Sequence, residues 1–350
     1  MEGALMKSDL LDQLSILIVT FQGDALLQNC LESLSNDCGL KPEIIVVDNS
    51  ATTLTRALVG KYANTRYIAS TENLGFAGGN NLGISSCTRP YVLLLNNDTI
   101  IHKEPFTQLI QYLIDHPHVG VVQGTMNLPN HGNTLDACGV LLTSSGEQYI
   151  RLEHRPTATT KRPNRAVFAA KGACLLFRRS IIKDLDGVLF YDHFQAYYEE
   201  SNFCHRVWLS GHEVHFVDTP PIDHLLGQTA KKFPAETIQI QYISNLLFSH
   251  LTLLSTCGRW LLIPRLLLLH GIVFASSVLR RNWRSALVLP RAIKQTFLNR
   301  RRIMEVRKKI QATRTITDRE LFRKVLVRPP LRYYYLLLRG RVDEFTGNFE

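Results

Sequence analysis

Apolar and polar positions alternate in blocks over the first half of the chain. Four apolar runs have the length of buried strands: residues 14–21, 43–50, 65–70 and 91–95. Helix-like patterns lie between and after them, over residues 26–34, 73–86 and 105–114. Strand, helix and strand at this spacing predict a mostly parallel sheet with right-handed crossovers. Residues 120–124 read as one further strand.

The pattern changes twice further along. Residues 130–166 are polar and rich in turn formers, and we expect loops there. Residues 169–182 return to a strand followed by a helix, and residues 211–224 predict one late strand that ends near Asp223 and His224. From about residue 240 the apolar segments are long and helical. We therefore predict an α/β domain over residues 1–240 and a helical region over 241–350.

Polar side chains follow the predicted strands directly. Asp48 ends the second strand, and Asn96, Asn97 and Asp98 follow the fourth. The carboxyl ends of parallel strands meet at one edge, where ligands bind in open α/β sheets. The alternative is that each Asp caps the helix that follows it.

A glycine-rich segment, residues 73–81, adds a second feature to this edge. Its glycines allow the backbone to approach a ligand, and its amides can meet phosphate or a base. It matches neither GxGxxG nor a P-loop, which disfavours a dinucleotide oxidoreductase or a P-loop ATPase. A carboxylate beside phosphates implies a bridging divalent cation of the oxygen-binding type.

Two adjacent carboxylates, Glu199 and Glu200, form a further candidate. Repulsion between them raises one pKa towards the range of a general base. An ordinary acidic helix start, favoured by the helix dipole, is the alternative interpretation.

Charge is divided unevenly along the chain. Residues 256–350 hold 21 Lys and Arg against 6 Asp and Glu, whereas residues 1–255 hold 19 against 24. Such a basic end suits an anionic membrane surface or nucleic acid, and a solvated helix face is the simpler alternative. The 7 cysteines form no CxxC pair, which suits a reducing cytoplasm. The first residues show no signal-peptide pattern.

Residues 260–279 are apolar over a length that spans a bilayer. Arg265 and His270 lie within them, and we expect Pro264 to break the helix. We therefore expect the segment to lie in the membrane interface, with the basic sequence facing anionic lipid. An inserted hairpin and helices that bind protein remain as alternatives. Nucleic-acid binding is disfavoured because the basic residues alternate with aliphatic runs and not with stacking aromatics.

Taken together, these motifs resemble glycosyltransferase family 2, in its bacterial rhamnosyltransferase-like branch. "LSILIVTF", "EIIVVDNS", "NLGFAGGNNLGI" and "YVLLLNNDT" are similar to the family's nucleotide-binding half, in the same order. "KGACLLFRRSII", "FQAYYEESNFCHR" and "VDTPPIDH" are similar to its acceptor half. The resemblance covers residues 13–228. It implies a GT-A-type fold, a nucleotide-sugar donor, a divalent metal (Mg²⁺ or Mn²⁺) and inversion at the anomeric carbon.

The resemblance also implies roles for particular residues. Asp98 and His224 are expected at the metal and the diphosphate, and Glu200 as the general base with Glu199 beside it. An Asn, Asn202, stands where the family has a later Asp, and Arg206 is expected to pair with the acidic doublet. Contacts to the donor are expected from five residues: Asp48, Asn73, Gly75, Phe76 and Asn97.

The implied function is transfer of a sugar, with rhamnose favoured, from a nucleotide-diphosphate donor to a glycan or lipid-linked acceptor during cell-surface polysaccharide synthesis. We expect a cytoplasmic protein on the inner face of the membrane that binds no nucleic acid. Two alternatives stay open. A sugar-1-phosphate nucleotidyltransferase would need basic residues after the first strand, which "TFQGDALL" lacks. An inactive, membrane-recruited binding module would account for Asn96 and Asn202.

Overall fold

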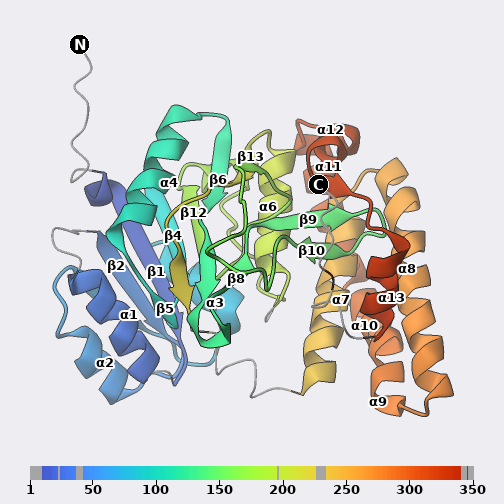
Figure 1. The fold of residues 1–350 in the computed structure, drawn as a ribbon, viewed down its shortest axis with the longest axis horizontal. Coiled ribbons are helices and arrows are strands. Elements are labelled where there is room, and N and C mark those ends of the chain that lie inside the picture. The colour runs from blue at the N-terminus through green and yellow to red at the C-terminus, as the bar shows by residue number, and fades with distance from the viewer. Residues whose placement is uncertain are drawn as a thin grey trace.

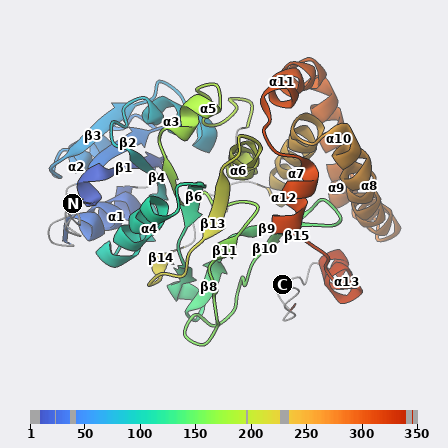
Figure 2. The same cartoon turned by 90° about the horizontal axis from the view of Figure 1, so that it is seen from above.

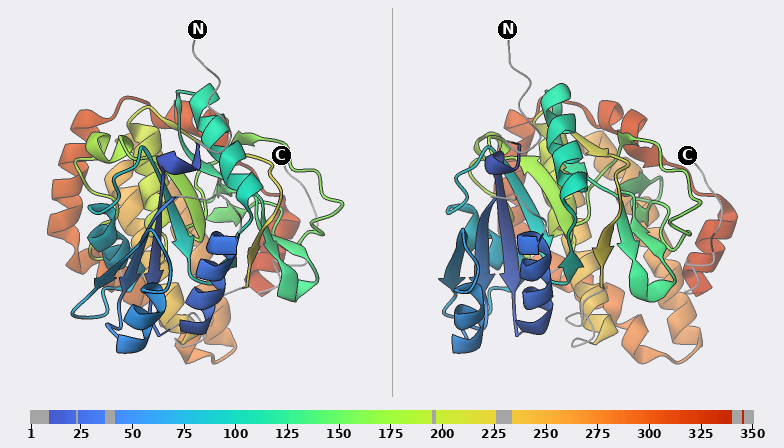
Figure 3. Two further views of the ribbon diagram at one scale, coloured as in Figure 1. Left: turned by 90° about the vertical axis from the view of Figure 1, so that its left-hand side faces the viewer. Right: turned by 60° about the vertical axis from the view of Figure 1, so that its left-hand side comes forward.

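The structure, a computed structural model, describes residues 10–22, 24–36, 42–194, 197–225, 234–339 and 345. A mixed sheet flanked by helices occupies one side, and a group of helices from the last third of the chain occupies the other (Figure 1). Helix α6, Glu199–Leu209, lies between the two, as the view from above shows (Figure 2). Seen from the side of the first strands, the C-terminal helices lie behind the sheet (Figure 3).

The central sheet has eight strands in the order β11-β13-β6-β12-β4-β1-β2-β3. They are β1 Leu14–Thr20, β2 Glu43–Asp48, β3 Thr65–Ala69, β4 Tyr91–Asn96, β6 Val119–Gln123, β11 Arg165–Ala166, β12 Cys174–Arg178 and β13 Glu213–Phe216. The pairs β1–β2, β1–β4, β2–β3 and β6–β13 are parallel. A mostly parallel sheet was predicted, and the prediction is confirmed.

Helices cover both faces of this sheet because its strands are apolar on both. In β1, Ile16 and Ile18 belong to one buried cluster and Leu17 to the other. The first cluster includes residues of α1, α2 and α4, and the second includes residues of α3 and α6. The flanking helices are α1 Asp24–Asn36, α2 Thr53–Val59, α3 Gly75–Ile84, α4 Lys103–Asp115 and α5 Ile181–Asp184, with 3₁₀ turns at Leu11–Gln13 and Pro129–His131.

Strand β12 runs antiparallel to both of its neighbours, β4 and β6. Its first residues therefore lie at the same edge as the last residues of β4. The Asn96 N–H, at the end of β4, donates to the Ala173 carbonyl at 3.0 Å. This reversed strand brings the segment before β12 to the edge where Asp98 lies.

Two smaller sheets correct the sequence interpretation of residues 130–166 and 211–224. One has the order β5-β14-β7-β8, and the other β10-β9-β15. Their strands are β5 Thr99–Ile100, β7 Met126–Leu128, β8 Thr134–Ala137, β9 Val140–Thr143, β10 Gln148–Ile150, β14 Ile222–His224 and β15 Leu326–Val327. Residues 134–150 thus form buried strands where loops were expected, because their polar residues find partners in the interior. The single late strand is two strands, β13 and β14, in different sheets.

The last third of the chain is helical, as predicted. Its helices are α7 Ala235–Leu253, α8 Thr256–Leu279, α9 Trp283–Ala286, α10 Val288–Leu298, α11 Arg300–Thr313, α12 Asp318–Val325 and α13 Leu331–Arg339. The expectation that Pro264 breaks the helix is wrong, because α8 continues through it. Pro264 lies in the third turn, where loss of one N–H donor is tolerated within a long helix. Within the described residues, α8 alone has the length and composition to cross a membrane, and only 22% of its most apolar window is buried.

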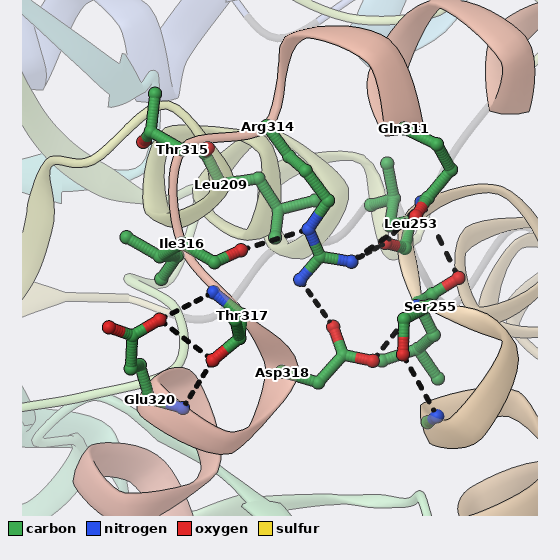
Figure 4. Close-up of polar contacts among 12 residues, drawn as sticks. Leu209, Leu253, Ser255, Gln311, Arg314, Thr315, Ile316, Thr317, Asp318 and Glu320 are labelled. Carbon is green, nitrogen blue, oxygen red and sulfur yellow. Dashed lines mark hydrogen bonds and ion pairs between the residues drawn. The ribbon is translucent and has the colours of Figure 1, made fainter.

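Polar contacts join these helices to one another and to the α/β part (Figure 4). The Asp318 carboxylate accepts from the Ser255 N–H at 2.8 Å and from the Arg314 guanidinium at 2.6 Å. The Thr315 N–H donates to the Leu209 carbonyl at the end of α6, 2.8 Å away. In addition, β15 pairs with β9. The end of the chain therefore completes a sheet of the preceding part.

Glycine residues let α3 pack closely on the sheet. A Cβ atom at Gly83 would collide with the Leu17 side chain and lie 2.8 Å from Val47 Cγ2, and one at Gly79 would lie 2.6 Å from Val19 Cγ1. Gly79 and Gly83 therefore serve helix–sheet contact, and the ligand approach expected for the glycines of residues 73–81 stays a prediction. At Gly75, φ is +67°, so this residue suits the turn that begins α3.

Gly83→Ala should destabilise the protein by about 1–3 kcal/mol, because the methyl group overpacks a buried contact with Leu17 and Val47. The matched control is Gly271→Ala in α8, where no atom lies within 4 Å of the added Cβ. The control should be neutral or gain about 0.5–1 kcal/mol, since Ala is the better helix former. Chemical denaturation of both variants measures the difference, and equal midpoints would contradict this packing.

Candidate functional site

Asp98 lies at the carboxyl end of β4, in the turn before β5. Its side chain is buried, and its Oδ1 atom is 3.3 Å from His224 Nε2. The two residues meet because His224 on β14 is the ladder partner of Thr99 on β5. The structure thus brings together the two residues that the sequence assigned to the metal and diphosphate.

A row of alternating charges continues from His224. Its Nδ1 lies 3.0 Å from Asp136 Oδ2, and the other oxygen of Asp136 lies 2.5 Å from Lys171 Nζ. Burial alone would lower the pKa of His224, but the hydrogen bonds and charges of Asp136 and Asp98 raise it to about 9. Burial would raise the pKa of Asp136, but His224 and Lys171 lower it to about 2. His224 and Asp136 therefore form a charged pair at neutral pH.

Sequence analysis missed Asp136 and Lys171. Asp136 lies in β8, inside the segment that was expected to form loops, and Lys171 precedes β12. Each residue is a single charge inside an apolar stretch, "TLDACGVLL" for Asp136 and "VFAAKGACLLF" for Lys171. That pattern could have identified them, since a buried charge requires a partner.

The acidic doublet begins α6 on the other side of Lys171. Glu199 is buried, and its Oε2 atom has no hydrogen-bond partner among the described residues, while Glu200 is partly exposed. Burial, and then the charge of Glu200, raise the pKa of Glu199 well above its usual range. Burial also raises the pKa of Glu200, which hydrogen bonds from backbone groups and the Lys171 charge oppose. Glu199 therefore holds a proton more strongly than Glu200 does.

Backbone strain marks the start of α6. Tyr197 and Tyr198 have φ values of +67° and +77°, a region that non-glycine residues adopt rarely. This bend directs Glu199 into the interior and leaves Glu200 at the surface of the site. Such conformations persist where the surrounding structure imposes them, often at functional sites.

Phe76, at the start of α3, lies close to Glu200. A Cβ atom at Gly172 would lie 3.4 Å from the Phe76 ring and 3.6 Å from the Glu200 Cβ, so both side chains contact the same backbone position. The Asn73 side chain accepts from the Gly75 N–H at 3.0 Å, and Asn97 donates to Thr20 Oγ1 at 2.9 Å. Asn73 and Gly75 thus form the turn that presents Phe76, and Asn97 joins β4 to β1.

Asp48 is buried at the end of β2 with its carboxylate fully engaged. It accepts hydrogen bonds from Ser50, Thr52 and Tyr67 at 2.6–3.0 Å. Burial raises its pKa, and these hydrogen bonds outweigh burial and lower it. The contacts agree with the alternative in which Asp48 holds the turn before a helix. A contact between Asp48 and the nucleoside stays a prediction.

The expected ion pair between Arg206 and the acidic doublet is wrong. The Arg206 guanidinium donates to Asn202 Oδ1 at 3.0 Å and to the carbonyls of Val188 and Leu189. Asn202 in turn donates to Ser249 on α7 at 2.8 Å. An amide at position 202 offers both a donor and an acceptor, which an aspartate does not. Asn202 therefore joins α6 to α7.

Comparisons with known proteins match this arrangement. The family model described as glycosyl transferase family 2 matches residues 15–186. This part of the chain is a glycosyl transferase family 2 domain. The predicted family is thereby confirmed, while the rhamnosyltransferase-like branch stays a prediction. The family 2 domain contains β1–β4, β12, Asp98, Asp136 and Lys171, and Glu200 and His224 follow it.

Two curated relatives are similar to the chain. It is 30% identical over 206 residues to "Low-salt glycan biosynthesis hexosyltransferase Agl10" of Haloferax volcanii, covering 57% of this chain and 63% of the relative. It is 26% identical over 194 residues to "Amylovoran biosynthesis glycosyltransferase AmsE" of Erwinia amylovora, covering 54% and 66%. The match spans somewhat under two thirds of each relative's length.

The crystal structure of S. aureus TarS residues 1–349 superposes with a TM-score of 0.55 at 16% identity, covering 95% of this chain and 88% of that chain. At this identity the likeness concerns the fold alone. Together with the family 2 domain and the sheet order, it confirms the predicted GT-A-type fold.

Lys171→Met should move the low-pH limb of donor turnover to higher pH. The Lys171 charge lowers the pKa of Glu200, so its loss makes protonation of Glu200 easier as the pH falls. The pH profile of kcat/KM, normalised to its plateau, measures this shift. Lys183→Met, an exposed lysine on α5, is the matched control and should leave the limb in place. An unmoved limb in Lys171→Met would contradict the coupling.

Proposed function

We propose that the chain is an inverting glycosyltransferase that transfers a sugar from a nucleoside diphosphate to a hydroxyl of a glycan or lipid-linked acceptor in cell-surface polysaccharide synthesis. The observation that carries the proposal is the charged row from Asp98 through His224, Asp136 and Lys171 towards Glu200. The row offers a site for a divalent cation at one end and leads to the carboxyl of Glu200 at the other, on a family 2 domain. Rhamnose as the sugar rests on the sequence resemblance.

The Asp98 end fits a hard divalent cation, Mg²⁺ or Mn²⁺. Its buried Oδ1 lies 3.3 Å from His224 Nε2 and has no other polar partner among the described residues. Carboxylate oxygens are ligands of such cations. A bound cation neutralises charge that grows on the departing diphosphate. His224 would release its Nε2 proton to ligate the cation, and otherwise it supplies its own positive charge beside the diphosphate.

At the other end, Glu200 removes the proton from the acceptor hydroxyl. The acceptor oxygen then forms a bond to the anomeric carbon as the bond from that carbon to the diphosphate oxygen breaks. Attack from the face opposite the diphosphate inverts the configuration. The charge of Lys171 lowers the pKa of Glu200 against the effect of burial, and Asp136 holds both Lys171 and His224 in place. Phe76, which contacts the same backbone position as Glu200, is placed to cover the donor and exclude water.

Glu200→Gln keeps the shape of the side chain and removes its ability to accept a proton. Donor turnover should fall by about 10²–10⁴-fold, with the donor Kd little changed. Steady-state kinetics and calorimetry measure the two quantities. Glu199→Gln, which replaces the carboxyl that holds a proton more strongly, should retain most of the activity. Full turnover in Glu200→Gln would refute this mechanism, and a wild-type protein that binds donor without turnover would favour the inactive binding module.

Asp98→Ala should abolish metal-dependent binding of a nucleoside diphosphate, because it removes the carboxylate that would hold the cation. Titration calorimetry with Mn²⁺ and the nucleotide measures the loss, and circular dichroism checks the fold. Asp223→Ala, on the same strand as His224 but paired with Asn127 at 2.8 Å, is the matched control. Unchanged metal dependence in Asp98→Ala would show that the cation is held elsewhere.

We also propose that the C-terminal helices lie on the cytoplasmic face of the membrane. Large apolar side chains are exposed on α8, including Trp260 at 77%, Leu268 at 67% and Leu279 at 84%. A cavity of about 990 Å³ beside the start of α8 is lined by four arginines: Arg314, Arg319, Arg323 and Arg328. Exposed apolar and basic groups in one region suit anionic lipid.

Substitution is a better test of this attachment than truncation, because β15 pairs with β9 and α7 is joined to α6. Trp260→Ser with Leu268→Ser should reduce flotation of the full chain with anionic liposomes at low salt. Leu54→Ser, which replaces an apolar side chain 71% exposed on α2, is the matched control. Wild-type protein that stays free of the liposomes would rule out membrane attachment.

A further inference from the structure

Three side chains with metal-ligating atoms lie together away from the site described above. His118 precedes β6, and Glu213 and His215 lie on β13, the parallel neighbour of β6. The two strand residues are two positions apart and so point to the same face. The Glu213 N–H donates to the His118 carbonyl at 2.9 Å, which places the third residue beside them. One ligand atom from each residue lies within 4.8 Å of the others.

We propose that His118, Glu213 and His215 bind a zinc ion through two imidazole nitrogens and one carboxylate oxygen, with water as the fourth ligand. Two imidazoles and a carboxylate form a recognised zinc ligand set. Glu213 Oε2 and His215 Nε2 are already 2.8 Å apart, close to the roughly 3 Å that separates two ligands of one tetrahedral zinc ion. His118 is exposed, so its side chain can turn to close the site.

The surrounding residues hold the ligands in the required state. Tyr112 on α4 lies with its hydroxyl 2.9 Å from His215 Nδ1, which leaves Nε2 for the metal. Lys324 on α12 pairs with Glu213 Oε1 and leaves Oε2 free to ligate.

The zinc site is chemically distinct from the cation site at Asp98. Imidazole nitrogen favours zinc, whereas a carboxylate beside a diphosphate favours Mg²⁺ or Mn²⁺. Its ligands belong to β6 and β13, and the residues around them to α4 and α12. Bound zinc would therefore tie the start of β6 to β13. This inference is independent of glycosyl transfer.

The test is a calorimetric titration of zinc into chelator-treated full-length protein that is saturated with Mg²⁺. We expect one zinc ion per chain. His118→Ala should weaken binding at least 10-fold, because a ligand is lost, and Tyr112→Phe by about 10-fold through loss of ring orientation. His102→Ala is the matched control, since His102 is an exposed histidine just before α4, the helix that carries Tyr112. It should bind zinc as the wild type does.

A second measurement distinguishes zinc that stabilises the folded protein from zinc that binds weakly at the surface. Zinc should raise the Tm of the wild type and leave that of His118→Ala unchanged, because a ligand that binds only the folded state stabilises it. His118 is exposed, so this variant should fold normally. The proposal is overturned by a titration without saturation, by equal zinc affinity in His118→Ala and the wild type, or by a wild-type Tm that zinc does not raise.

Discussion

Asp136 is the residue on which the geometry of the candidate site depends. Its two carboxylate oxygens bind His224 on one side and Lys171 on the other, so a single buried anion places two cations. Burying these charges costs free energy that only their mutual pairing offsets. Loss of Asp136 would leave His224 and Lys171 without this partner, at both ends of the site. These close ion pairs therefore fix the positions of β8, β14 and the start of β12 relative to one another.

The reversed strand β12 and the small sheet β5-β14-β7-β8 follow from this requirement. The end of β4 supplies Asp98, but a purely parallel sheet would bring only strand ends to that edge. Because β12 is antiparallel to β4, the segment just before β12, which carries Lys171 and Gly172, lies at that same edge of the sheet. The pairing of β14 with β5 then places His224 over Asp98. The C-terminal helices contribute through α7, which joins α6 by the bond from Asn202 to Ser249. The helix that presents Glu200 is therefore supported from the side of the last third of the chain.

Local pattern was sufficient to predict the first half of the fold. The strands up to β4, the helices α1 and α3 and the position of Asp98 follow from apolar runs and their spacing, because the core on both faces demands such runs. Helix α2, between β2 and β3, was not predicted. The smaller strands of residues 134–150 were missed, since polar residues such as Asp136 and Glu147 interrupt them. Those residues are buried only because partners distant in sequence, His224, Lys171, Tyr242 and His270, satisfy them. Long-range pairing of this kind leaves no periodic signal.

A thermal-shift panel of nucleoside diphosphates, each with and without Mg²⁺ or Mn²⁺, tests the central claim that the carboxyl edge of this sheet binds a nucleotide-sugar donor. A ligand present at 100 times its Kd adds about 2.7 kcal/mol to the stability of the folded state. The account predicts that at least one nucleoside diphosphate raises the Tm, and that the divalent cation increases the shift. No shift with any nucleotide, or a shift that is the same with and without the cation, would contradict it.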